Sequence, residues 1–165
     1  MSALAQSRTA SENRVSRKRL PASLVVLSLL LGILVIGTFE AARAMITNPL
    51  EPLGMPTDWL KNTPVHTYFW PGMFFVGITL ATMLTLAGLL FGWRWTWARG
   101  MESRIGYRWP WFGAVSIGVV LLVFEIIELF LVPFHPVMHP LLIAWSALII
   151  WLPFTGSARR HLKVQ

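Results

Sequence analysis

Residues 110–132 read PWFGAVSIGVVLLVFEIIELFLV, and this stretch decides the fold class. It contains no charged residue apart from two glutamates. At about 1.5 Å of rise per residue, a helix of this length crosses a hydrocarbon core of about 30 Å. Pro110 suits the first helical turn, where its missing N–H costs nothing. The stretch therefore predicts a transmembrane helix that carries Glu125 and Glu128 inside it.

Three further apolar blocks of similar length lie at residues 21–46, 68–91 and 136–154. Four prolines between residues 47 and 67 forbid a continuous helix between the first two blocks. We therefore expect an all-α membrane protein, whose residues 21–154 form four transmembrane helices in an up-down-up-down bundle. These helices are called spans one to four, with residues 110–132 as span three.

The composition agrees with a membrane protein. Apolar residues make up 55% of the 165-residue chain and charged residues 13%, whereas a soluble domain carries about 25% charged residues. The high mean hydropathy of +0.61 also excludes a disordered chain. Because the sequence has no cysteine, disulfides, thiolate metal sites and cysteine nucleophiles are ruled out.

The distribution of basic residues predicts the orientation. Residues 1–20 and 155–165 are basic segments that we expect to be cytoplasmic tails, the first of them disordered. With four crossings, these tails and the loop at residues 92–109 share one side, and they carry twelve of the 14 Lys and Arg residues. The positive-inside rule then places both termini in the cytoplasm, and we expect a multi-pass protein of the plasma membrane. A cleaved signal peptide, cut near Arg43, is the alternative interpretation of span one.

The loop at residues 92–109 interleaves aromatic and basic side chains. This mixture can indicate nucleic-acid binding, but flanking membrane spans favour an interfacial aromatic belt with basic anchors. We therefore expect contact with the lipid bilayer and none with nucleic acid, and a homo-oligomer or a partner membrane subunit stays open. The predicted interfacial anchors are Trp93, Arg94, Trp95, Trp97, Arg99 and Trp109.

Acidic residues inside the spans are the main candidates for a functional site, since a charged side chain at a membrane helix centre costs about 3 kcal/mol on insertion scales. Glu125 and Glu128 are three residues apart and share one face of span three. Glu40 lies near the outer end of span one. Arg43 is expected to pair with Glu40 or to reach across to Glu128, away from the lipid.

Three histidines extend this polar group at the outer end of the bundle. His66 begins span two, while His135 and His139 flank the turn before span four. Prolines in that turn break the helix geometry that makes i, i+4 histidines a metal signal, so no metal site is predicted. The candidate ligand or proton site consists of Glu125, Glu128, Glu40, Arg43, His66, His135 and His139.

Two interpretations of this candidate site stay open. It is either an internal polar network that fixes the helix packing, or a cavity that binds a proton, a cation or a cationic small molecule. The chain has no G-x-S-x-G, P-loop, H-E-x-x-H or G-x-G-x-x-G motif, so no enzyme, catalytic residue or cofactor is predicted. We expect a non-enzymatic accessory or ligand-binding protein. Proton- or cation-coupled transport and a lipid or isoprenoid enzyme are the alternatives.

A motif in the loop between spans one and two resembles that of one group of membrane proteins. It reads L-G-M-P, then L-x-x-T-P, then an aromatic residue and P-G at the opening of span two. The pattern is similar to that of small four-span proteins from actinobacterial genomes whose activity is uncharacterised, and the resemblance implies the same architecture without an activity. The matching residues are Leu53, Gly54, Met55, Pro56, Leu60, Thr63, Pro64, Tyr68, Pro71 and Gly72.

Overall fold

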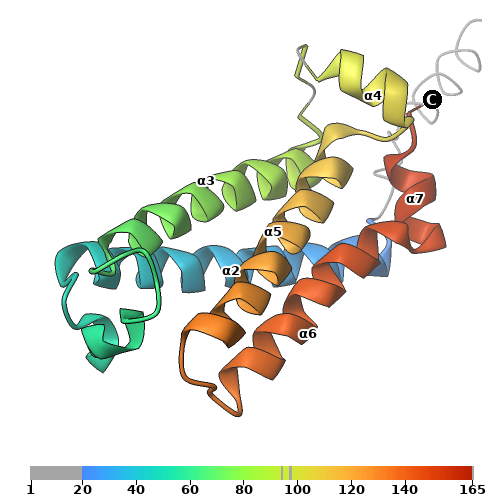
Figure 1. The fold of residues 1–165 in the computed structure, drawn as a ribbon. Helices are drawn as coiled ribbons and strands as arrows, with labels where there is room; N and C mark the ends of the chain where they lie inside the picture. Colours follow the sequence, from blue (N-terminus) through green and yellow to red (C-terminus); the bar gives the residue numbers. More distant parts are fainter. Residues whose placement is uncertain (1–19, 94, 97, 165) are drawn as a thin grey trace, which may run out of the picture.

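The computed structural model describes residues 20–93, 95–96 and 98–164 (Figure 1). These residues are all-helical and include no β-strand, as the sequence predicts. The predicted disordered tail, apart from its last residue, and the predicted anchors Arg94 and Trp97 lie outside the described residues. The helices are α2 (Ala22–Thr47), α3 (Phe69–Phe91), α4 (Arg99–Ile105), α5 (Trp109–Leu131), α6 (Met138–Trp151) and α7 (Gly156–Leu162), with short 3-10 turns at Pro52–Gly54, Thr57–Leu60 and Leu152–Phe154.

Three of these helices, α2, α3 and α5, are long and apolar enough to cross a membrane. The helix α6 has 14 residues and a length of about 21 Å, which is shorter than a hydrocarbon core. The segment Met138–Phe154 forms a candidate fourth span only together with α7, from which it is bent by 61°. The bend lies at Thr155, whose backbone is extended. The described residues therefore contain three candidate membrane spans, or four if the bent pair counts as one.

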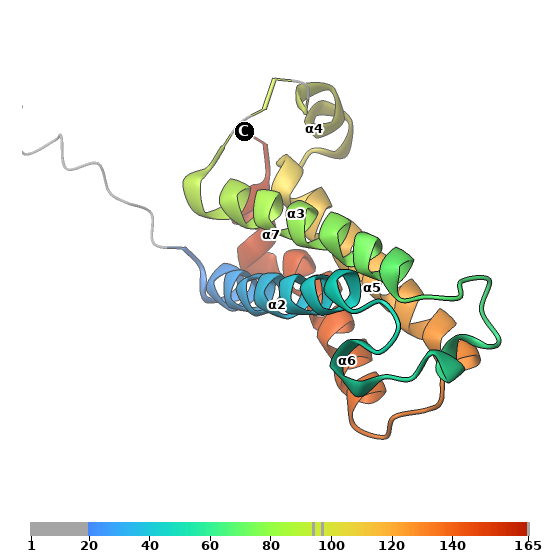
Figure 2. The same ribbon diagram turned by 90° about the vertical axis from the view of Figure 1, so that its left-hand side faces the viewer.

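The long helices form two hairpins that pack across each other (Figures 1 and 2). The most extensive contacts join α2 with α3 and α5 with α6, and α3 also packs on α5. In each hairpin the two helices run in opposite directions (Figure 1). The turn between α5 and α6, at residues 132–137, brings the end of one helix next to the start of the other.

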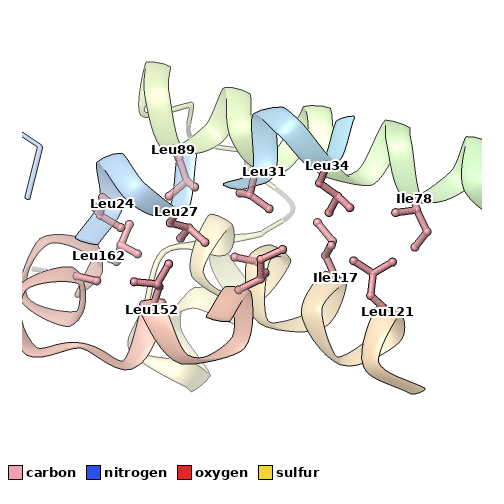
Figure 3. Close-up of a cluster of buried hydrophobic side chains, with 13 residues drawn as sticks. Leu24, Leu27, Leu31, Leu34, Ile78, Leu89, Ile117, Leu121, Leu152 and Leu162 are labelled. Atoms are coloured by element: carbon pink, nitrogen blue, oxygen red, sulfur yellow. The ribbon is translucent and has the colours of Figure 1, made fainter. Parts of the chain in front are cut away.

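The core lies where the hairpins meet. One face of α2 buries Leu24, Leu27, Leu31 and Leu34, which recur every three or four residues (Figure 3). Opposite them lie leucine and isoleucine side chains of α3, α5 and α6 and of the segment that follows α6 (Figure 3). In α5, Gly118 is in close contact with α6, since a Cβ atom there would lie 3.1 Å from the carbonyl oxygen of Ser146. Such small residues let membrane helices approach closely.

At one end of the molecule, hydrogen bonds join three separate parts of the chain. The backbone N–H of Arg108 donates to the carbonyl of Leu162, at 2.8 Å, and that of Val164 donates to the carbonyl of Gly106. The hydroxyl of Ser157 lies 2.9 Å from that of Ser23, at the start of α2. The beginnings of α2 and α5 and the end of the chain therefore lie at the same end of the helical bundle.

The predicted anchors in the described residues differ in their surroundings. Trp93 and Arg99 are exposed, and the ring of Trp95 stacks on that of Trp109 with centroids 5.2 Å apart. Trp109 is buried, and its indole N–H donates to the carbonyl of Trp93 at 2.7 Å. Trp109 therefore belongs to the packing of the loop against α5 and not to an exposed aromatic belt.

Candidate functional site

Three of the seven predicted site residues meet at the end of the bundle that holds the α5–α6 turn. Glu125 of α5 and His139 of α6 are buried, with 4% and 6% of their surface exposed. Glu128, one turn further along α5, is half-buried. Each of the three offers a ligand atom, a carboxylate oxygen or a ring nitrogen, within 4.8 Å of the others. We call Glu125, Glu128 and His139 the carboxylate–histidine cluster.

Local sequence explains how α6 places His139 in the carboxylate–histidine cluster. His139 is the second residue of α6, and Pro140 follows it in the first turn, where a proline removes no helical hydrogen bond. The ring of Phe134, in the turn, stacks on the ring of His139 with centroids 5.6 Å apart. The Nδ1 atom of His139 lies 3.4 Å from Oε2 of Glu125. The imidazole is thus held against α5 with Nδ1 toward the carboxylates.

A cavity of about 350 Å³ adjoins the cluster, and both carboxylates line it. Its wall is otherwise almost entirely apolar. The hydroxyl groups of Thr38 and Ser146 donate to carbonyls of their own helices, so they are already paired. The indole N–H of Trp145 is buried without a hydrogen-bond partner in the described part of the chain. The lining residues are Ile33, Leu34, Gly37, Thr38, Ala41, Phe75, Leu121, Glu125, Glu128, Met138, Leu141, Leu142, Trp145 and Ser146.

Glu40 and Arg43 do not join the cluster. The guanidinium of Arg43 donates from Nε and Nη2 to Oε2 of Glu40, at 3.0 and 2.8 Å, so the carboxylate predicted within its reach is present. Both side chains are more than half exposed, however, which places the pair on the surface of α2 and not inside the bundle. The interior face of α2 at this level is formed by Thr38, Ala42 and Met45.

The other two histidines also lie apart from the cluster. His66 is exposed in the connection before α3. His135 is exposed as well, and its Nδ1 accepts a hydrogen bond from the backbone N–H of Met138 at 3.3 Å. Because α6 begins at Met138, His135 and His139 are not on one helical face. His135 therefore helps to begin α6. Of the seven residues predicted to form the site, the structure brings three together.

Sequence reasoning missed the polar contact between the first two long helices. The hydroxyl of Thr79 in α3 donates to that of Thr38 in α2, at 2.8 Å, and both residues are buried. Threonine is common within apolar membrane helices, and its hydroxyl can bond its own helix. The sequence pattern therefore does not indicate that these two threonines lie opposite each other.

Two carboxylates and an imidazole can exchange protons or hold a cation. Comparison of the chain with protein-family models, with curated proteins and with solved structures finds no significant match. The chemistry of the cluster therefore has to be argued from its own geometry.

Proposed function

We propose that the chain is a multi-pass plasma-membrane protein that binds a small cation, without enzymatic activity, at the carboxylate–histidine cluster. The observation that carries this proposal is the placement of Glu125 and Glu128 at an otherwise apolar cavity. Charged groups in such surroundings are costly unless a partner compensates them. Two carboxylates that face one cavity favour a positively charged ligand.

The four-span arrangement, with both termini in the cytoplasm, is part of this proposal. The segment after α6 is hydrogen-bonded to residues 106–108, which precede α5. If α5 crosses the membrane, α6 with its bent continuation has to return to the side where α5 began. Ser23 and Ser157 are in contact, which supports the start of α2 on that same side. The excess of Lys and Arg on these segments supports a cytoplasmic location.

This orientation places the cluster in the half of the bundle that faces away from the cytoplasm. Glu125 lies six residues before the end of α5, a distance of about 9 Å along the helix. Membership of the actinobacterial four-span group fits this arrangement and remains part of the proposal. No specific contact among the described residues favours the transport or lipid-enzyme alternatives over cation binding.

The test is a thermal unfolding experiment on the purified full chain in detergent. Chloride salts of butylammonium, tetraethylammonium, Zn²⁺, Mn²⁺ and Ca²⁺ are the probes. We expect at least one of these cations to raise the unfolding temperature of the parent protein and of Glu51→Gln, whose carboxylate is exposed in the loop after α2. The double variant Glu125→Gln, Glu128→Gln should lose this effect. Absence of stabilisation by every cation, or equal stabilisation of the double variant, would contradict the proposal.

A further inference from the structure

We infer that the carboxylate–histidine cluster is a site for a divalent transition-metal ion, with Zn²⁺ as the ion that fits best. The inference rests on the proposal that the cluster binds a cation, and it names which kind. Glu125 and Glu128 would supply one oxygen ligand each from α5, and His139 would supply a ring nitrogen from α6, with Nδ1 the nitrogen beside the Glu125 carboxylate.

The distance between the two buried ligands supports this assignment. A charge-assisted hydrogen bond between an imidazole and a carboxylate measures about 2.7–2.9 Å. The separation of 3.4 Å between Nδ1 of His139 and Oε2 of Glu125 is longer than that. Two ligands that are each about 2.1 Å from a tetrahedral zinc lie about 3.4 Å apart. The pair is thus too far apart for a strong hydrogen bond and well separated for two ligands of one metal ion.

The hydrogen bonding of the carboxylate–histidine cluster also supports a metal site. Buried polar groups in proteins are normally paired. In the part of the chain that the structure describes, the Glu125 carboxylate has a long contact of 3.4 Å with His139, and both carboxylates border the cavity. On α2, the charged groups of Glu40 and Arg43 pair with each other and not with the cluster. A divalent ion would neutralise both carboxylates and add to the long contact with His139.

The ligand types select among metals. Imidazole nitrogen favours Zn²⁺, Fe²⁺, Ni²⁺ and Cu²⁺, whereas Ca²⁺ takes six to eight oxygen ligands and Mg²⁺ keeps several waters. A set of one nitrogen and two carboxylate oxygens therefore favours a borderline metal over a hard one. Three protein ligands leave a fourth tetrahedral position for water or for a bound molecule, as in open zinc sites. Both carboxylates line the cavity, which leaves space beside them for such a molecule.

The experiment measures zinc binding by the full chain after removal of any polyhistidine tag. Protein in detergent is dialysed against buffered Zn²⁺, and the zinc bound per chain and its dissociation constant are determined. We expect one zinc per chain in the parent. Removal of an outer-shell partner alone weakens metal affinity by about 10–100-fold, so removal of a ligand in Glu128→Gln or His139→Gln should weaken it at least about tenfold. Ca²⁺ at the same concentration should not compete.

Two matched controls distinguish zinc binding at the cluster from zinc binding to exposed groups on the protein surface. His66→Gln and Glu51→Gln remove exposed groups of the same types outside the cluster, and their zinc affinity should equal that of the parent. Glu128 is half-buried, so its glutamine variant tests the site even if substitution of the buried His139 impairs folding. Unchanged zinc binding in Glu128→Gln, or loss of zinc in His66→Gln instead, would overturn the inference.

Zinc binding and thermal stabilisation by cations together distinguish the inferred metal site from the proposed cation site. If an alkylammonium ion stabilises the parent through Glu125 and Glu128 while zinc does not bind, the metal site is wrong and the cation site stands. If neither kind of cation binds, both are wrong.

Discussion

The Nδ1 atom of His139 lies 3.4 Å from Oε2 of Glu125, although the two residues are fourteen positions apart in the chain and belong to different helices. The contact depends on the close packing of α5 and α6, for which Gly118 makes room. The three side chains of the cluster therefore come from one helical hairpin, and both hairpins line the cavity beside it.

Gly118→Ala should destabilise the protein and weaken cation binding together. The added Cβ would lie 2.7 Å from Cγ1 of Ile150 and 3.1 Å from its backbone nitrogen, so α6 has to shift. Overpacking of this kind costs about 1–3 kcal/mol. Reversible unfolding in mixed micelles measures the cost. Gly77→Ala is the control, because no atom lies within 4 Å of its added Cβ. Equal stability of the two variants would show that α5 and α6 do not approach as described.

Glu125→Gln should leave a folded protein that no longer responds to cations. Glutamine keeps the size of the side chain and an oxygen acceptor toward His139, so we expect the free energy of unfolding to change by less than about 1.5 kcal/mol. Glu125→Leu should be less stable than Glu125→Gln, because it leaves the buried His139 without its partner, and removing one partner of a buried pair costs about 3–5 kcal/mol. Unfolding with and without ZnCl₂ measures both effects. Retention of the full cation response by either variant would contradict the role of Glu125.

Arg43→Gln should have little effect on stability or on the site. The ion pair with Glu40 is more than half exposed on α2 and does not reach the cluster. Exposed ion pairs contribute about 0–1 kcal/mol in water. We expect the zinc affinity of Arg43→Gln to match that of the parent in the dialysis measurement. A loss of zinc affinity comparable to that of Glu128→Gln would mean that Arg43 acts on the cluster.

Cysteine substitutions test the proposed topology, and the parent chain has no cysteine to interfere. Ser103 of α4 and Asn62 in the connection before α3 are both exposed. In intact cells, a membrane-impermeant thiol reagent should label Asn62→Cys and not Ser103→Cys, and permeabilised cells should show labelling of both. Labelling of Ser103→Cys from outside intact cells would overturn the orientation with cytoplasmic termini.

The bounds of the long helices follow closely from the sequence, because twenty or more apolar residues between prolines and polar loops leave few alternatives. Which face of each helix points into the bundle does not follow from the sequence. Core and lipid are both apolar, so the pattern around α2 could not indicate that Leu31 and Leu34 face inward while Glu40 and Arg43 face outward. Sequence spacing correctly placed Glu125 and Glu128 on one face of α5.

The choice of histidine could not be predicted from local sequence. His135 and His139 are each followed directly by a proline, and their different roles depend on the residue at which α6 begins. Because the helix starts at Met138, the ring of His139 is carried into the bundle while that of His135 stays in the turn. Hydropathy does not indicate that starting point, because the apolar stretch of span four extends on both sides of Met138.

Zinc K-edge X-ray absorption of the tag-free protein, loaded with one equivalent of Zn²⁺, tests the central claim most directly. We expect nitrogen and oxygen ligands at about 2.0–2.2 Å, including the scattering of one imidazole ring. In Glu128→Gln the signal of this ordered site should be lost or strongly reduced. A spectrum of a hydrated ion without imidazole scattering, or one identical in the parent and in Glu128→Gln, would contradict the assignment of the carboxylate–histidine cluster as a metal site.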